Sequence, residues 1–208
     1  MRIVGGKYKG RVFRPNKNFK SRPTTDIAKE GLFNILENRY DFSNKIILDI
    51  FSGTGSIGYE FISRGCLEAT MVDIDYIHYR FILSVVDKLE IKNARVYRAD
   101  ALKFIQNVKK SFDIIFADPP FNLKNLKEIP DFIFNSPVLK ANGLFVLEHP
   151  KDFDFSQHKN FREIRKYGKV NFSFFARQGA FISVSVGQKN HIFALDKLQF
   201  SLQVMLVA

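Results

Sequence analysis

The chain has 208 residues, of which 46% are apolar and 23 are phenylalanine, enough to bury the core of one domain. A single cysteine, Cys66, excludes an internal disulfide framework, and no apolar run approaches the roughly 18 residues of a membrane span, so we expect a cytoplasmic protein. The net charge of +11 is concentrated in residues 1–29, where nine Lys or Arg face one acid, which favours a nucleic-acid partner.

The chain begins with a basic segment. Two short β-compatible runs, Arg2–Val4 and Arg11–Phe13, flank a glycine-rich turn and predict a two-stranded hairpin. Tyr8 and Phe13 either stack on bases or pin this hairpin to the domain. The basic residues expected to contact RNA phosphates are Arg2, Lys7, Lys9, Arg11 and Arg22.

A helix is predicted after Pro23, because proline disfavours helix in the residue before it. Any of Thr24, Thr25 and Asp26 can cap this helix. Its apolar face follows the helical spacing and consists of Ala28, Leu32, Ile35 and Leu36.

The run Ile46–Ile50 predicts a strand buried on both faces, followed by a glycine turn and a helix that ends at Gly65. Such a unit forms a ligand pocket at the carboxyl end of a parallel sheet. The spacing Gly53-x-Gly55-x-x-Gly58 also matches the dinucleotide fingerprint, with Asp73 at the distance of a ribose acid. Asp49, inside the strand, suits a ligand that carries positive charge. A nicotinamide cofactor and a purely structural turn both stay open at this point.

Further strands and helices alternate along the chain, which predicts a doubly wound, mostly parallel sheet with an antiparallel pair at its edge. Pro130 is expected to break or kink a helix over 124–135. The strands are predicted at Glu68–Val72, Arg95–Arg98, Phe112–Ala117, Gly143–Glu148, Phe161–Tyr167 and Val170–Phe175. In the tail, Phe181–Val186 and Leu198–Val207 alternate like strands around a turn at Gly187–Asn190.

Acids follow several of these strands. Asp73 is the better positional match for the ribose hydroxyls of a cofactor, while Asp75 competes for that role or caps the helix Tyr76–Leu89. Asp100 is placed to cap the helix that follows it. The fourth strand ends in Asp118-Pro119-Pro120-Phe121, a stiff corner for which a nicotinamide enzyme has no use.

Four segments together resemble the RsmD-type methyltransferases: Arg2-Ile-x-Gly-Gly, the run Arg22-Pro-Thr-x-Asp-x-x-Lys-Glu-x-x-Phe-Asn34, the glycine turn, and Asp118-Pro-Pro-Phe121. This bacterial family methylates the N2 amine of one guanine, position 966, in 16S ribosomal RNA. The resemblance runs from about Met1 to Phe175. The first two segments are specific to the family, and the last two are shared with the wider class I methyltransferases.

The resemblance implies an α/β, Rossmann-like domain with a seven-stranded, doubly wound sheet and S-adenosylmethionine as cofactor. The chain would consist of a basic N-terminal hairpin extension over 1–22, a methyltransferase domain over 23–176 and an apolar C-terminal tail of uncertain role over 177–208. The partner would be 16S rRNA or an assembly intermediate of the small ribosomal subunit, and the protein is expected to act as a monomer.

The family pattern also assigns roles to residues. Asp118 and the Pro119 carbonyl would accept the two N–H bonds of the amine while Phe121 stacks on the flipped base. The cofactor would be held by Asp49, Phe51, Ser52, Gly53, Thr54, Gly55, Asp73, Asp100 and Ala101. The four histidines lack ligand spacing, so no metal is expected. An adenine-N6 methyltransferase and a non-catalytic nucleic-acid-binding module are the alternatives.

Overall fold

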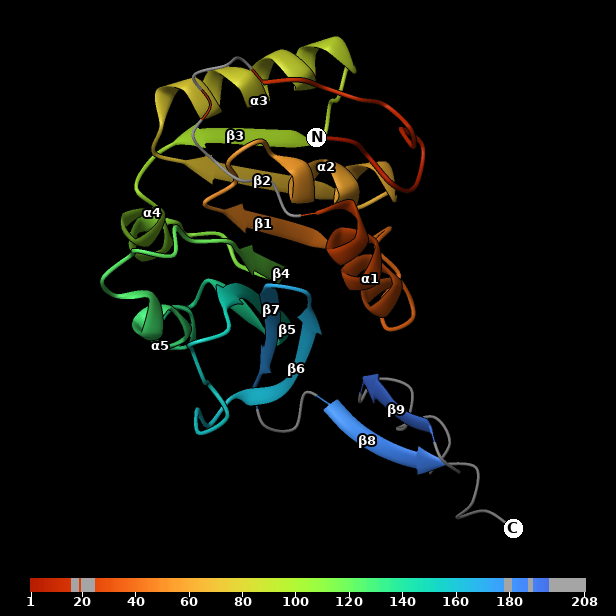
Figure 1. Ribbon diagram of the computed structural model, residues 1–208, viewed down its shortest axis with the longest axis vertical. Coiled ribbons are helices and arrows are strands. Elements are labelled where there is room, and N and C mark those ends of the chain that lie inside the picture. The colour runs from red at the N-terminus through yellow and green to blue at the C-terminus, as the bar shows by residue number, and fades with distance from the viewer. Residues whose placement is uncertain (16–18, 20–24, 178–180, 187–188, 195–208) are drawn as a thin grey trace.

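The structure is a computed structural model that describes residues 1–15, 19, 25–177, 181–186 and 189–194. Its centre is a seven-stranded sheet in the order β3-β2-β1-β4-β5-β7-β6 (Figure 1). Neighbouring strands are parallel except at β7, which runs antiparallel to β5 and β6, so the predicted doubly wound sheet is confirmed. The strands are β1 (Ile46–Ile50), β2 (Glu68–Asp73), β3 (Ala94–Arg98), β4 (Phe112–Ala117), β5 (Leu139–Pro150), β6 (Phe161–Tyr167) and β7 (Val170–Ala176).

Helices cover both faces of the sheet. The apolar residues of α1, α2 and α3 pack in one core cluster, and those of α4, η1 and α5 pack in a second. Two clusters form because successive side chains of a strand point to opposite faces of the sheet. In strand β5, Leu144 and Val146 join the first cluster, and Phe145 and Leu147 join the second. The helices are α1 (Asp26–Glu37), α2 (Ser56–Ser63), α3 (Tyr76–Lys88), α4 (Ala101–Asn107), η1 (Leu126–Glu128) and α5 (Ile129–Phe134).

The order of the strands creates a switch point between β1 and β4. From β1 the chain moves outward through β2 and β3, and it then returns to add β4 on the other side of β1. The connections on the two sides leave the sheet toward opposite faces, so they separate at the carboxyl ends of β1 and β4. Ligands of open α/β sheets bind in the crevice that forms there.

Two predicted features can be compared with the structure. The predicted helix over 124–135 is interrupted as expected, because η1 ends at Glu128 and α5 begins at Ile129, with Pro130 in the first turn of α5, where its missing N–H needs no partner. In the tail, β8 (Phe181–Val186) pairs with β9 (Lys189–Ala194), so Lys189 and Asn190, predicted in a turn, lie in a strand. The predicted strand Leu198–Val207 lies outside the described residues.

The N-terminal segment pairs with itself over a single bridge, between Arg2 and Val12, instead of forming two full strands. Ile3 and Phe13 turn into the core cluster of α1–α3, and Gly5 donates its N–H to Glu60 instead of to the opposite strand. The burial of Phe13 shows that it pins the segment to the domain. Among the described residues, no helix is long and apolar enough to cross a membrane.

Candidate active site

Four carboxylates lie at the carboxyl edge of four adjacent strands and line one cavity of about 1070 Å³. Two residues before each acid, the strand places an apolar side chain in the core cluster of α1–α3. Because side chains alternate between the faces of a strand, all four acids belong to that same face. They are Asp73 of β2, Asp49 of β1, Asp118 after β4 and Glu148 of β5.

The glycine turn closes one side of the cavity. Gly53 and Gly55 have φ of +53° and +75°, which L side chains rarely adopt, and Phe51 between strand and turn shares this left-handed conformation at +59°. Gly55 caps α2 and does not line the cavity, whereas Phe51, Ser52, Gly53 and Thr54 do.

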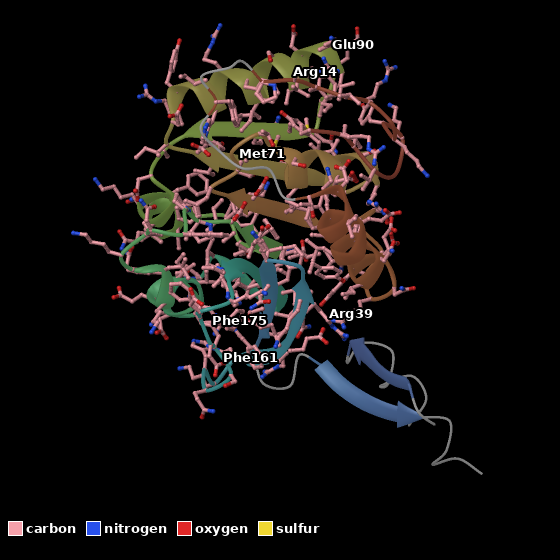
Figure 2. The ribbon with its side chains drawn as sticks, viewed as in Figure 1. Arg14, Arg39, Met71, Glu90, Phe161 and Phe175 are labelled. Atoms are coloured by element: carbon pink, nitrogen blue, oxygen red, sulfur yellow. The ribbon has the colours of Figure 1, made fainter. Side chains whose placement is uncertain are left out.

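Gly58 lets α2 approach the sheet closely. A Cβ atom at this position would lie 2.5 Å from the Sδ atom of Met71 on β2, a distance that real Cβ atoms do not show. Met71 is labelled in Figure 2, where it lies in the region of β2 and α2. The third glycine of the motif is therefore required by packing between helix and sheet.

Asp49 is buried, and its Oδ2 accepts the backbone N–H of Gly58 at 3.0 Å. The pKa of this carboxyl is raised to about 8: burial is the main cause, the Gly58 N–H opposes it, and the charge of Asp73 adds to it. A cationic ligand in the cavity would favour the charged form of Asp49.

Asp73 and Asp75 both line the cavity, but different hydrogen bonds hold them. Asp73 accepts the N–H of Gly53 at 2.8 Å and that of Asp75 at 2.9 Å, so it is held beside the glycine turn. Asp75 caps α3 by accepting the N–H of Ile77 at 2.6 Å. The Nδ1 atom of His78 lies 3.2 Å from Asp73. Burial lowers the pKa of His78, but the carboxylates of Asp73 and Asp75 outweigh it and raise that pKa.

Asp100 and Ala101 follow β3, at the opposite edge of the sheet from the β6–β7 hairpin, and both line the cavity at the start of α4. Asp100 caps α4 by accepting the N–H of Lys103 at 2.9 Å, and it also lines the cavity. A carboxylate has two oxygens, so capping leaves it able to accept a further hydrogen bond.

The corner after β4 brings Asp118, Pro119 and Phe121 to the cavity. Burial raises the pKa of Asp118 well above its usual value, and the charges of Glu148 and then Asp49 raise it further. Pro119 is buried, whereas 47% of the Phe121 side chain is exposed at the rim. An acidic floor and an exposed aromatic ring at the entrance fit a flat ligand that carries N–H donors.

Comparisons with known proteins identify the family of this chain. The family model described as Conserved hypothetical protein 95 matches residues 1–176. The chain belongs to this family, the RsmD family. It is 37% identical over 149 residues to the ribosomal RNA small subunit methyltransferase D of Buchnera aphidicola subsp. Baizongia pistaciae, covering 71% of this chain and 75% of that one.

Two further relatives extend this result. The protein of the same description from Escherichia coli is 31% identical over 148 residues, which cover 71% of this chain and 74% of the relative. A solved structure of a hypothetical protein from Thermus thermophilus is 29% identical and superposes with a TM-score of 0.76 over 85% of this chain and 99% of that one. The RsmD-type fold predicted from the sequence is thus confirmed.

Some residues of this RsmD-type cavity had not been predicted from the sequence. Glu148 was missed although it closes an apolar run, the pattern that had identified Asp49. The start of α1, at Thr25, Ile27 and Ala28, also lines the cavity, as do Ser56, Ile57, Ile74 and the hairpin tip at 166–170. No local pattern marks these residues, since the fold alone brings them to the cavity.

Four of the five predicted RNA-contacting residues are described by the structure, and these four lie outside the cavity. Lys7, Lys9 and Arg11 are exposed on the N-terminal segment. Arg2 is also exposed, and its Nε lies 2.9 Å from Oδ2 of Asp26. Arg22 lies outside the described residues.

Proposed function

We propose that this protein transfers a methyl group from S-adenosylmethionine to the exocyclic N2 amine of a guanine in 16S ribosomal RNA. The observation that carries this proposal is the corner Asp118–Phe121, which shares one cavity with the glycine turn at the switch point of the sheet. Relatives described as ribosomal RNA small subunit methyltransferase D support the substrate class.

The cavity fits the cofactor in size and in chemistry. Its volume of about 1070 Å³ is at the upper end of the range for ligand sites, which leaves room for a base beside the cofactor. The buried carboxyl of Asp49 suits the cationic methionine end, Asp73 suits the ribose hydroxyls, and Asp100 with Ala101 suits the adenine. The glycine turn, with Phe51, Ser52 and Thr54, would pack against the ligand. When bound, S-adenosylmethionine supplies an electrophilic methyl group on a sulfonium sulfur.

The corner after β4 provides what the amine needs. The N2 lone pair of guanine is delocalised into the ring, which makes the amine a weak nucleophile. The Asp118 carboxylate and the Pro119 carbonyl would accept its two N–H bonds and direct the lone pair toward the methyl carbon. Asp118 would also take up the proton that N2 loses on methylation. Phe121 would stack on the base.

The basic N-terminal segment would provide the contact with RNA. Lys7, Lys9 and Arg11 project from it as exposed cations, and they lie outside the cavity, so they can contact phosphates without taking part in the chemistry. We assign RNA contact to residues 1–22 and catalysis to 23–176. The RNA would be presented either alone or in an assembling small subunit.

A direct test uses small ribosomal subunits and free 16S rRNA from a strain that lacks this gene. Each is incubated with the purified protein and methyl-labelled S-adenosylmethionine, and mass spectrometry identifies the methylated nucleoside. We expect N2-methylguanosine. N6-methyladenosine would replace the proposal with the adenine alternative. RNA binding without any transfer would favour a non-catalytic module.

A further inference from the structure

Glu148 occupies the position next to Asp118 across the sheet. Strands β4 and β5 are parallel, and their register ends at the pair Ala117 and Leu147. Asp118 and Glu148 each follow one residue later, and their side chains belong to the same face. Neighbouring strands lie about 4.8 Å apart, so the two carboxylates are near neighbours at the floor of the cavity.

The backbone around Glu148 is held rigidly. Glu148 pairs with Phe172 in the antiparallel ladder between β5 and β7, and only 3% of its surface is exposed. The next residue, His149, is anchored to Ser173, with Nε2 2.8 Å from Oγ. Glu148 lines the cavity from this position, so its carboxylate is presented to a ligand by a fixed strand.

Two neighbouring carboxylates match one edge of guanine. Guanine carries two adjacent donors there, the N1–H and the N2 amine, whereas adenine carries an amine next to N1, which is an acceptor. A carboxylate placed at N1 accepts the guanine N–H and repels the lone pair of adenine. A buried site that is built to hydrogen-bond one group rejects strongly an analogue that lacks it.

We propose that Glu148 accepts a hydrogen bond from the N1–H of the target guanine, beside Asp118, and so selects guanine over bases whose N1 is an acceptor. This role rests on the proposed function, because it requires guanine as the substrate. Asp118 holds the reacting amine, and Glu148 is a specificity-determining residue that reads the adjacent ring nitrogen.

The test compares guanine with 2-aminopurine at the target position of reconstituted small subunits. 2-Aminopurine keeps the amine at C2 but has a lone pair at N1 and no O6. We expect the wild-type protein to prefer guanine in kcat/KM by at least roughly 100-fold. In Glu148→Gln this preference should fall about tenfold or more, because the amide can also donate to N1. The missing O6 affects both proteins equally and cancels in the comparison.

The ratio of kcat/KM for the two substrates, measured on one variant, does not change when part of that protein is inactive. Glu128→Gln, which removes an exposed carboxylate outside the cavity, should keep the wild-type ratio. Glu148→Asp retains an acceptor and should keep most of the preference. If Glu148→Gln is inactive on both bases, competition binding of the two RNAs gives the same ratio.

The outcomes separate the two proposals. A guanine preference unchanged in Glu148→Gln, in kcat/KM or in competition binding, overturns the role of Glu148 and leaves the proposed function intact. A wild-type protein that methylates neither RNA overturns the proposed function itself.

Discussion

Lys29 and Glu60 form a buried ion pair between α1 and α2, with Nζ 3.9 Å from Oε1. The Lys29 ammonium also donates to the Arg2 carbonyl and, at 2.9 Å, to the hydroxyl of Ser56, which lines the cavity. Burial lowers the pKa of Lys29, and the charge of Glu60 opposes that shift. Glu60 accepts the backbone N–H of Gly5, so the pair fastens the N-terminal segment to the cavity wall.

Glu60→Gln should destabilise the protein by about 3–5 kcal/mol, because it removes the buried counter-charge of Lys29 and leaves only Asp26, a more exposed carboxylate that also lies 3.9 Å from Nζ. The double variant Lys29→Met, Glu60→Gln should recover part of this loss. Urea unfolding gives the free energies. Lys110→Gln, which breaks the exposed pair with Glu68, should cost no more than about 1 kcal/mol. Strictly additive losses in the double variant would mean that the two charges do not interact.

Asp118→Asn should lower turnover by roughly 100-fold or more, since the charged acceptor at the reacting amine is lost. Affinity for S-adenosylhomocysteine, measured by calorimetry, should stay close to that of the wild type, because the predicted cofactor contacts are made by other residues. Near-normal turnover in this variant would assign Asp118 a structural role only.

The activity should rise with pH. Burial, then Glu148, then Asp49 raise the pKa of Asp118, so at low pH the carboxyl is protonated and is a poor acceptor for the amine. Deprotonation restores the charged acceptor as the pH increases. Removing the neighbouring charge in Glu148→Gln should lower the pKa of Asp118 and move this rise to lower pH. A pH profile of kcat/KM measures both effects, and a rate that falls with pH would contradict the assignment.

Asp73→Ala should weaken S-adenosylmethionine binding by roughly 1–3 kcal/mol, because the ribose hydroxyls would lose their acceptor. Asp75→Ala is the matched control. It removes the cap of α3 and should cost about 1 kcal/mol of folding stability with little change in cofactor affinity. Calorimetry and thermal unfolding separate the two losses. Equal weakening of cofactor binding in both variants would make Asp75 a second ribose acid.

Neutralising Lys7, Lys9 and Arg11 should flatten the salt dependence of RNA binding. Each phosphate contact contributes about 0.7–0.9 to the slope of log affinity against log salt, so the slope should fall by up to roughly two to three units. Cofactor affinity should not change. The control replaces three exposed lysines elsewhere, Lys92, Lys109 and Lys151. If plots of log affinity against log salt have the same slope for both triple variants and the wild type, the N-terminal segment does not contact phosphates.

The sequence alone was enough to predict the elements that local patterns encode. The apolar run Ile46–Ile50 with its glycine turn and the corner at Asp118 follow from neighbouring residues, because buried strands and turns have short-range rules. The sequence also limited the cap of α1 to three residues, and the structure selects Thr25. Pro130 shows the limit, since the sequence predicted an interruption there but not that the α-helix would lie on the C-terminal side of the proline.

Only the tertiary structure decided which of these elements share the site. Glu148 lies beside Asp118 because β5 pairs with β4, a register set by packing on both faces of the sheet across 30 residues of chain. Lys29, which the sequence shows only as one cation of the basic stretch 1–29, is buried because Glu60 and the N-terminal segment pack against it. Side chains distant in sequence meet where buried apolar contacts fix the register of the strands, and no local pattern carries that information.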